Sequence, residues 1–194
     1  MCAATLFTVF FSREEVATFA AGCFWGVELT FQRIPGVLRT SVGYAGGHAG
    51  TSSYRAVSGG RTGHAEAVQI VFDPDVVSYE ELLAVLWERH DATTKNRQGA
   101  DVGTQYRSAI FYHSERQRVA AEASKGEHQR ALGAGGGGGG GGRRRARKVV
   151  TDIVAADGGV EMAYHAAEDY HQQYLEKGGQ SAGKGETARI SCYG

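Results

Sequence analysis

The stretch VATFAAGCFWGVELTFQRI, residues 16–34, joins a short apolar run to a run with helical periodicity. Residues 16–20 are apolar and lead to a glycine, which is typical of a buried strand. Beyond Cys23, apolar residues recur three or four positions apart, as on one face of a helix: Phe24, Val27, Phe31 and Ile34. The stretch therefore predicts a strand-to-helix turn with Cys23 at the start of the helix.

Similar patterns predict the other elements of one sheet and its helices. Ser78 and Glu81 form a capping box for the helix YEELLAVLWERH, residues 79–90. Further strands are predicted over residues 37–44, 65–72, 107–113 and 148–155, and further helices from Ser114 to about Leu132 and over 166–177. The leading order of strand, helix, strand, strand, helix, strand is that of the ferredoxin-like split βαβ arrangement. We therefore expect an α+β two-layer sandwich with an appended helix, strand and irregular C-terminal tail.

The length of the chain fits one domain. With 194 residues, 42% of them hydrophobic, the chain can bury a single core. We assign residues 16–178 to one domain, 1–15 to a short N-terminal extension and 179–194 to a mobile, glycine-rich tail. Eight glycines, Gly135 to Gly142, precede RRRARK and predict a flexible insertion at about 133–147. The basic cluster is either a localisation or nucleic-acid patch or, more simply, a solvated edge.

Charge and hydropathy give no support for a nucleic-acid or membrane partner. Lys and Arg number 21 and match 21 Asp and Glu, so no overall field favours nucleic acid or an anionic membrane. No apolar run approaches the roughly 18 residues of a membrane span. The N-terminal MCAATLFTVFFSREE also lacks a basic region before its apolar part. We therefore expect a cytoplasmic protein with small or neutral partners, and a monomer by default.

The cysteines form neither a disulfide scaffold nor a metal motif. Cys2, Cys23 and Cys192 are too few for a disulfide framework and lack the spacing of a zinc site. The seven histidines contain no HExxH-like pair. We expect no structural metal and no bound cofactor, and redox or nucleophilic chemistry of the thiols stays open.

The position of Cys23 favours a reactive thiol. A thiol attacks as its thiolate, and the unpaired N–H groups at the start of a helix lower a thiol pKa. The alternative is a small buried side chain that only fills a tight turn. Phe24 and Trp25 cannot share one helical face, so one of them is expected to lean toward Cys23, unless both pack beneath the helix.

Several polar residues are candidates for acid chemistry. Glu66 lies between alanines in GHAEAV at the start of a strand, where burial would raise its pKa and let it hold a proton. Asp101 and Tyr106 lie in the loop RQGADVGTQYRS, and Tyr54 follows the glycine-rich loop AGGHAGTSS. Catalytic polar groups often lie on such loops, although each residue alone could be an ordinary surface or capping residue.

Taken together, these segments resemble the A-type peptide methionine sulfoxide reductases over residues 16–194. The resemblance is carried in family order by GCFWG (22–26), SVGYAGG (41–47), SYRAVSGGRTGHAEAV (53–68), DVGTQYRSAIFYH (101–113) and AEDYHQQYL (167–175). It implies that Cys23 is the nucleophile and Glu66 the proton donor to the sulfoxide oxygen. Phe24 and Trp25 would form the walls that receive the S-methyl group of the substrate. The supporting hydrogen-bonding positions would be Tyr54, Asp101 and Tyr106.

The resemblance also implies a course for the reaction. Attack of Cys23 on the S epimer of methionine sulfoxide, free or in proteins, would give methionine and a Cys23 sulfenic acid. A second cysteine would then form a disulfide, which thioredoxin or another dithiol would reduce. Such an enzyme repairs oxidised proteins under oxidative stress.

The tail departs from the pattern of many relatives, which end in two cysteines. Here the sequence reads KGETARISCYG, with Glu186 about where the first cysteine would stand. Cys192 is therefore the resolving candidate, and we expect a direct Cys23–Cys192 disulfide. Cys2 matches no family position and is interpreted as incidental. Ala92 replaces the usual proline after His-Asp.

Two other classes of function remain open from the sequence. A peroxidase or other thiol oxidoreductase could use Cys23, although it would leave the aromatic pair unexplained. A non-catalytic module could bind methionine sulfoxide in proteins, with an incidental cysteine in its tail. Coupled turnover with thioredoxin distinguishes these functions.

Overall fold

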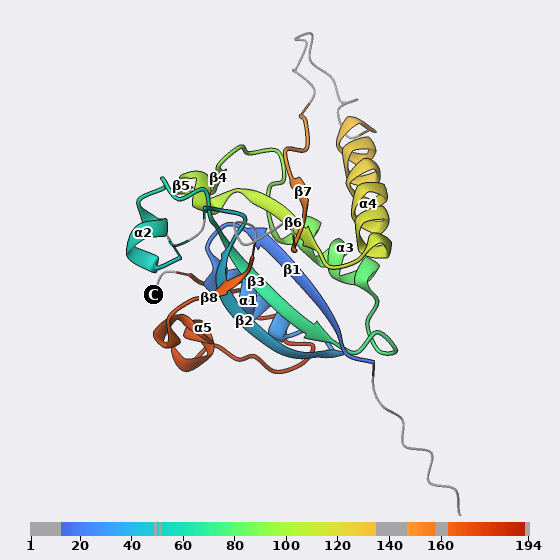
Figure 1. The fold of residues 1–194 in the computed structure, drawn as a ribbon. Helices are drawn as coiled ribbons and strands as arrows, with labels where there is room; N and C mark the ends of the chain where they lie inside the picture. The colour runs from blue at the N-terminus through green and yellow to red at the C-terminus, as the bar shows by residue number, and fades with distance from the viewer. Residues whose placement is uncertain (1–12, 49, 51, 135–146, 158–162, 193–194) are drawn as a thin grey trace, which may run out of the picture.

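The computed structural model describes residues 13–48, 50, 52–134, 147–157 and 163–192. Its main sheet has six strands in the order β7-β6-β1-β3-β2-β8 (Figure 1). Four central strands pair antiparallel with one another: β1 (Glu15–Ala21), β2 (Val37–Ala45), β3 (Ala65–Phe72) and β6 (Ser108–Tyr112). With α1 (Phe24–Gln32) and α3 (Tyr79–Arg89), they confirm the predicted α+β sandwich and its split βαβ order.

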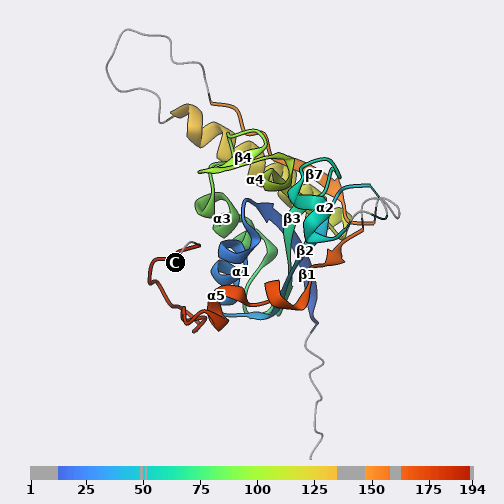
Figure 2. The ribbon, with the colours of Figure 1, turned by 90° about the vertical axis from the view of Figure 1, so that its left-hand side faces the viewer.

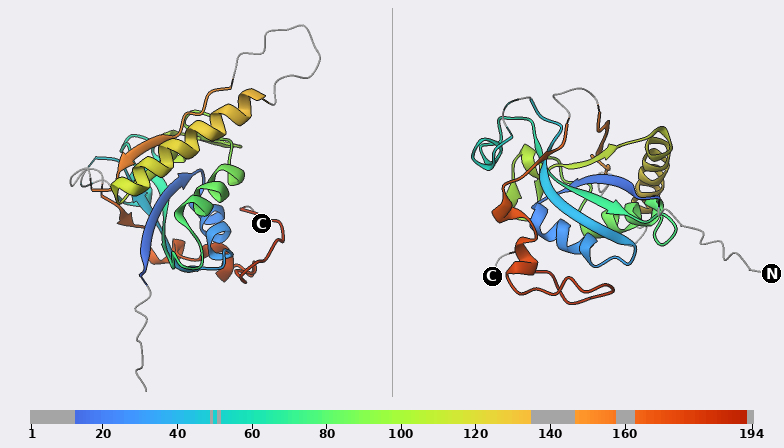
Figure 3. Two further views of the ribbon diagram at one scale, coloured as in Figure 1. Left: turned by 90° about the vertical axis from the view of Figure 1, so that its right-hand side faces the viewer. Right: turned by 60° about the horizontal axis from the view of Figure 1, so that its bottom comes forward.

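Two outer strands extend this core. β7 (Asp152–Ala155) runs parallel to β6, and β8 (His165–Ala166) pairs antiparallel with β2. α4 (Glu115–Ala134) comes between β6 and β7 in the chain and packs against α3 (Figures 1 and 3). Cys2 and residues 135–146 of the predicted insertion lie outside the described residues.

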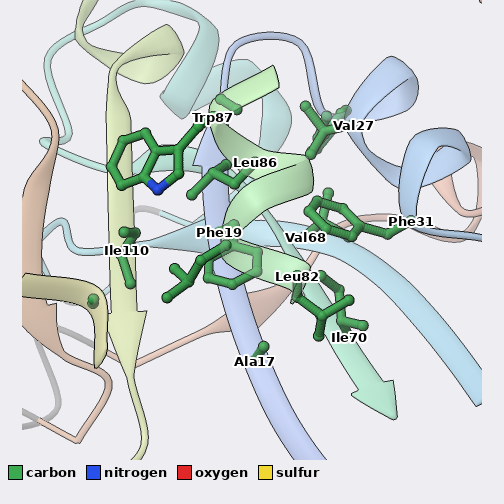
Figure 4. Packing of buried hydrophobic residues seen from close by; sticks show 14 of the residues in the cluster. Ala17, Phe19, Val27, Phe31, Val68, Ile70, Leu82, Leu86, Trp87 and Ile110 are labelled. Atoms are coloured by element: carbon green, nitrogen blue, oxygen red, sulfur yellow. The ribbon is translucent and has the colours of Figure 1, made fainter. Parts of the chain in front are cut away.

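The main core lies between the sheet and the helices α1 and α3, which cover the same face (Figures 2 and 3). Figure 4 shows Phe19 of β1 beside Leu82 and Leu86 of α3, all fully buried. Alternate strand residues point to the opposite face, where a smaller cluster of mostly alanine side chains packs around Phe111. This two-residue alternation is what the strand patterns predicted.

The predicted capping hydrogen bonds of α3 and α4 are present. Ser78 Oγ accepts a hydrogen bond from the backbone N–H of Glu81 at 3.2 Å, and the Glu81 carboxylate accepts one from the Ser78 N–H at 2.8 Å. At the start of α4, Ser114 Oγ accepts a hydrogen bond from Gln117 N at 3.2 Å. Within the described residues, no helix combines the length and apolar character needed to cross a membrane.

Short elements gather at the end of the sheet where β1 finishes (Figure 1). They are α2 (Tyr54–Ser58), the hairpin strands β4 (Arg97–Gln98) and β5 (Asp101–Val102), and the 3-10 turn η1 (Thr104–Tyr106). Because β1 leads directly into α1 here, these loops surround the start of that helix.

The prediction of a last helix over 166–177 is wrong. This segment forms β8, a 3-10 turn η2 (Asp169–His171) and a short helix α5 (Tyr174–Lys177). The Gln172 amide donates to Val42 O and Ala167 O, which favours an extended path, and Gln173 takes a left-handed conformation with φ of 51°. The strand predicted from residue 148 likewise begins only at Asp152.

Candidate active site

The turn between β1 and α1 places Cys23 at the helix start. Gly22 has φ of +93°, and a Cβ atom there would lie 2.7 Å from Cβ of Gln98. Glycine is therefore required both by the backbone and by the close approach of β4. Cys23 is the N-cap residue of α1, as the sequence predicts, and its thiol is free.

Glu66 lies directly beside this helix start. One carboxylate oxygen of Glu66 accepts a hydrogen bond from the backbone N–H of Phe24 at 3.0 Å, and the residue is only 4% exposed. Burial raises the pKa of Glu66 to about 7, and the negative charge of Asp101 adds to the increase, while the Phe24 N–H opposes it. Glu66 can therefore hold a proton at neutral pH.

The Cys23 thiol has several neighbours that act on its pKa. The hydrogen bond to Cys192, burial and the negative charge of Glu66 all raise the pKa of Cys23, whereas a hydrogen bond from the backbone of Trp25 lowers it. The backbone N–H groups at the helix start thus lower the pKa of Cys23, as predicted. Their effect is smaller than the combined effect of burial, the contact with Cys192 and a charged Glu66, which raise it. A protonated Glu66 removes one of the groups that oppose the Cys23 thiolate.

Aromatic residues directly follow Cys23 in the first turn of α1. Phe24 is 1% exposed and packs against Tyr44, with ring centroids 5.9 Å apart. Trp25 is partly buried and stacks on Tyr174 at 3.9 Å. Phe24 also belongs to the main core cluster, so its ring serves both packing and the site.

His171 joins these rings and was not recognised from the sequence. Its ring lies 5.2 Å from Phe24, 5.6 Å from Trp25 and 4.6 Å from Tyr54, measured between centroids. Trp25 Nε1 donates a hydrogen bond to His171 Nδ1 at 3.2 Å, so the remaining proton of the neutral ring is on Nε2. Burial lowers the pKa of His171 and keeps the ring neutral. The only available signal was its place in the segment AEDYHQQYL.

The loops bring two tyrosines and Asp101 to the same place. Burial and the negative charge of Glu66 raise the pKa of Tyr106 to about 12, and Tyr54 is shifted upward by the same two causes. Asp101 in turn acts on both Glu66 and Tyr106. The candidate site residues from α1, α2, β3, β5 and η1 therefore lie within electrostatic reach of one another.

Glu168 fastens the Tyr54 side of the site. Its carboxylate accepts hydrogen bonds from Tyr44 Oη and from the backbone N–H of Tyr54, both at 2.9 Å. These bonds tie α2 to the segment that carries His171. Glu168 is therefore a positioning residue that the sequence did not single out.

The C-terminal tail runs back toward α1 (Figure 2), and its Cys192 contacts Cys23 at the start of that helix. Arg33 at the end of α1 donates to the carbonyls of Ser181 and Ala188, at 2.9 and 2.5 Å. Lys184 Nζ donates to Gln32 O at 2.6 Å, and Gly185 N donates to Arg33 O at 2.7 Å. The described part of the tail is irregular, as predicted, and these contacts dock it along the helix. Its mobility stays a prediction.

The two free thiols are in contact. The Cys23 side chain hydrogen-bonds to Cys192, and this bond lowers the pKa of Cys192 while it raises that of Cys23. Within this contact the hydrogen bond therefore favours ionisation of Cys192 over ionisation of Cys23. Among the described residues, no group of three or more His, Cys, Asp or Glu side chains is placed to hold a metal ion.

Comparisons with known proteins match this geometry to one family. The family model described as "Peptide methionine sulfoxide reductase" matches residues 15–190. The rice protein "Peptide methionine sulfoxide reductase A2-1" is 50% identical over 180 residues, which cover 93% of this chain and 87% of the relative. "Peptide methionine sulfoxide reductase MsrA" of Methanosarcina acetivorans is 53% identical over 165 residues, 85% of this chain and 79% of the relative.

Solved structures with a similar fold come from the same family. Methionine sulfoxide reductase A of Corynebacterium diphtheriae superposes with a TM-score of 0.75 at 36% identity, covering 92% of this chain and 82% of that one. Reduced Mxr1 of Saccharomyces cerevisiae gives a TM-score of 0.73 at 34% identity and 87% coverage of each chain. Mxr1 has also been solved in complex with Trx2; that chain is 22% identical and shows a likeness of fold alone.

Proposed function

The chain belongs to the peptide methionine sulfoxide reductase family of oxidoreductases, and we propose that it reduces the S epimer of methionine sulfoxide, free or in proteins, to methionine. The observation that carries this proposal is the convergence of three groups on the start of α1. Cys23 occupies the N-cap position, the Glu66 carboxylate accepts a hydrogen bond from the next backbone N–H, and the Cys192 thiol contacts Cys23.

The aromatic rings supply a site for the S-methyl group. Phe24 and Trp25 follow Cys23 directly, and His171 fixes the indole of Trp25 through a hydrogen bond. An apolar pocket favours the methyl group over the sulfoxide oxygen. The oxygen is then directed to the polar side, where Glu66, Tyr54, Asp101 and Tyr106 lie.

The first chemical step is a transfer of oxygen from sulfoxide to thiol. Cys23 attacks the sulfoxide sulfur as a thiolate, and the oxygen gains a proton from Glu66 as the S–O bond is activated. Transfer of the hydroxyl group to Cys23 leaves methionine and a Cys23 sulfenic acid, so methionine sulfur is reduced by two electrons and Cys23 is oxidised by two. Burial of Glu66 suits this role because it keeps the donor protonated near neutral pH.

The second step regenerates the enzyme. Cys192 attacks the sulfenic sulfur, a Cys23–Cys192 disulfide forms, and the hydroxyl group leaves as water after it takes a proton. A dithiol protein such as thioredoxin then reduces the disulfide. The docked tail supports a direct disulfide, and the complex of Mxr1 with Trx2 shows that a protein of this fold engages such a partner. A cytoplasmic, monomeric enzyme that repairs oxidised proteins stays our expectation.

A coupled assay tests the proposal. The protein is incubated with thioredoxin, thioredoxin reductase, NADPH and either the S or the R epimer of methionine sulfoxide, and methionine is quantified. We expect NADPH-dependent methionine from the S epimer only. Faster turnover of hydrogen peroxide than of the sulfoxide would favour a thiol peroxidase. Binding of the sulfoxide without any methionine would favour the non-catalytic module.

A further inference from the structure

We propose that Arg89, at the end of α3, is a positioning residue for the resolving step, in which its positive charge keeps Cys192 as a thiolate beside Cys23. This inference rests on the proposed function, since it concerns the disulfide that regenerates the enzyme. Arg89 lies outside the five segments that carry the family resemblance. It is 63 residues away from Gly26 in the chain and joins the site only in the fold.

The guanidinium of Arg89 is held against α1 by fixed partners. Arg89 Nε donates to Thr30 Oγ1 at 3.0 Å, and Thr30 Oγ1 in turn donates to Gly26 O at 2.8 Å. The Arg89 Nε also lies 3.5 Å from Gly26 O. These bonds engage Nε, and Nη2 lies near Cys192 Sγ of the tail.

Gly26 provides the space in which Arg89 and Cys192 meet. A Cβ atom built on Gly26 would lie no more than 2.5 Å from both Arg89 Nη2 and Cys192 Sγ. Because both atoms are that close to one point, they are at most about 5 Å apart. At this separation an opposite charge in a partly buried site favours the ionised thiol. A side chain larger than hydrogen at position 26 would occupy the place of both atoms.

Three charged or titratable groups act on the Cys192 sulfur. Cys23 of α1 lowers the pKa of Cys192 through its hydrogen bond, and Arg89 of α3 lowers it through its charge and a hydrogen bond. Burial and the charge of Asp101 in β5 act in the opposite direction. Glu66 of β3 acts on the partner thiol Cys23. Within the described residues, Arg89 is the only cation among the groups that act on the two thiols.

This charge bears on the rate of disulfide formation. The Cys192 thiolate supplies an electron pair to the sulfenic sulfur of Cys23, the S–S bond forms, and the S–O bond breaks. The leaving hydroxide takes one proton and departs as water. Only the thiolate attacks, so a cation that keeps Cys192 ionised raises the rate at pH values below the ordinary thiol pKa of about 8.5.

The first test measures the titration of Cys192 without any substrate. In a Cys2→Ser, Cys23→Ser background, Cys192 is the single thiol, and its alkylation rate by iodoacetamide is followed from pH 4.5 to 9.5. We expect Arg89→Met to move the midpoint up by about one pH unit or more, and Arg89→Lys to restore part of the change. Arg116→Met, which removes a cation 60% exposed on α4, should leave the midpoint in place. An unchanged midpoint in Arg89→Met would overturn the inference.

The second test measures one turnover of the enzyme with all its cysteines. After mixing with methionine S-sulfoxide, we expect Arg89→Met to release methionine at the normal rate but to form the disulfide about three- to tenfold more slowly at pH 6. At pH 9, where the thiol ionises without help, the variant should be no slower than the unmodified chain. Equal slowing at both pH values would show a merely structural role and refute the charge effect.

The two tests separate this inference from the proposed function. Absence of methionine release from the unmodified chain would contradict the function, yet the alkylation profile would still report on Arg89. A normal turnover with an unshifted alkylation profile would contradict the inference alone.

Discussion

The Glu66 carboxylate accepts a hydrogen bond from the backbone N–H of Phe24, the residue after Cys23, at 3.0 Å. This bond links β3 to the first turn of α1 and places the buried Glu66 side chain next to the helix start that carries Cys23. The bond favours the carboxylate, but burial outweighs it and raises the pKa of Glu66 to about 7. One residue therefore both fixes the helix start and carries a proton at neutral pH.

Glu66→Gln tests the proton donor. The amide oxygen can still accept the Phe24 N–H, but the side chain no longer supplies an acidic proton. We expect methionine release in a single turnover to fall by roughly 10² or more, the usual contribution of a positioned acid. Glu81→Gln, at the exposed capping box of α3, is the matched control and should keep its rate. A normal rate in Glu66→Gln would remove Glu66 from the chemistry.

Stability should depend on pH through the same residue. The pKa of Glu66 is about 7 in the folded chain and about 4.5 when unfolded, so the unfolded state loses the proton first as pH rises. The folded state thus loses stability between about pH 4.5 and 7, by up to about 3 kcal/mol. The free energy of unfolding of Glu66→Gln, relative to the unmodified chain, should rise across this window in urea titrations. If the difference in free energy of unfolding between Glu66→Gln and the unmodified chain stays constant from pH 4 to 8, burial does not raise the pKa of Glu66.

His171→Phe tests the support of the aromatic pocket. Phenylalanine keeps a ring between Phe24 and Tyr54 but removes the acceptor of the partly buried Trp25 Nε1, which costs about 1 kcal/mol or more. We expect kcat/KM for methionine S-sulfoxide to fall about tenfold or more, with tryptophan fluorescence altered by a changed Trp25 environment. His128→Phe, whose ring stacks on Trp87 at 5.0 Å in the α3–α4 contact, is the control. Identical kinetics in both variants would exclude a role for His171 in the pocket.

Gly26→Ala tests the space for the resolving thiol. Alanine favours a helix more than glycine, so propensity alone would stabilise α1. Its Cβ would nevertheless collide with Cys192 Sγ and Arg89 Nη2. We expect the first methionine to be released but the disulfide to form at least tenfold more slowly. In Gly126→Ala of α4, where a Cβ would meet only Arg130 Nη1 at 3.5 Å, disulfide formation should be unchanged. Rapid disulfide formation in Gly26→Ala would rule out the docked position of Cys192 as the reactive one.

The sequence predicts those parts of the molecule that local patterns control. The turn at Cys23, the capping box at Ser78 and the alternating strands follow from periodicity and cap chemistry, and they suffice for the sandwich. Local patterns failed over 166–177, because the Gln172 amide pairs with β2 and replaces helical hydrogen bonds with tertiary ones.

The site could be predicted less completely, for the same reason. Cys23 and Glu66 stand out by their local context. His171 and Arg89 do not, because their partners Trp25 and Gly26 are 146 and 63 residues away in the chain. His171 and Arg89 reach the site only through the packing of η2 and α3 against α1, and no local sequence pattern predicts that packing.

The most direct measurement of the central claim is the mass of the protein after one addition of methionine S-sulfoxide, followed by alkylation and peptide mapping. We expect the unmodified chain to lose two hydrogens and to form a disulfide that joins the peptides of Cys23 and Cys192, with Cys2 still alkylated. Cys192→Ser should release one equivalent of methionine and retain one oxygen on Cys23. An unchanged mass, or an oxidised pair that excludes Cys23, would contradict the account.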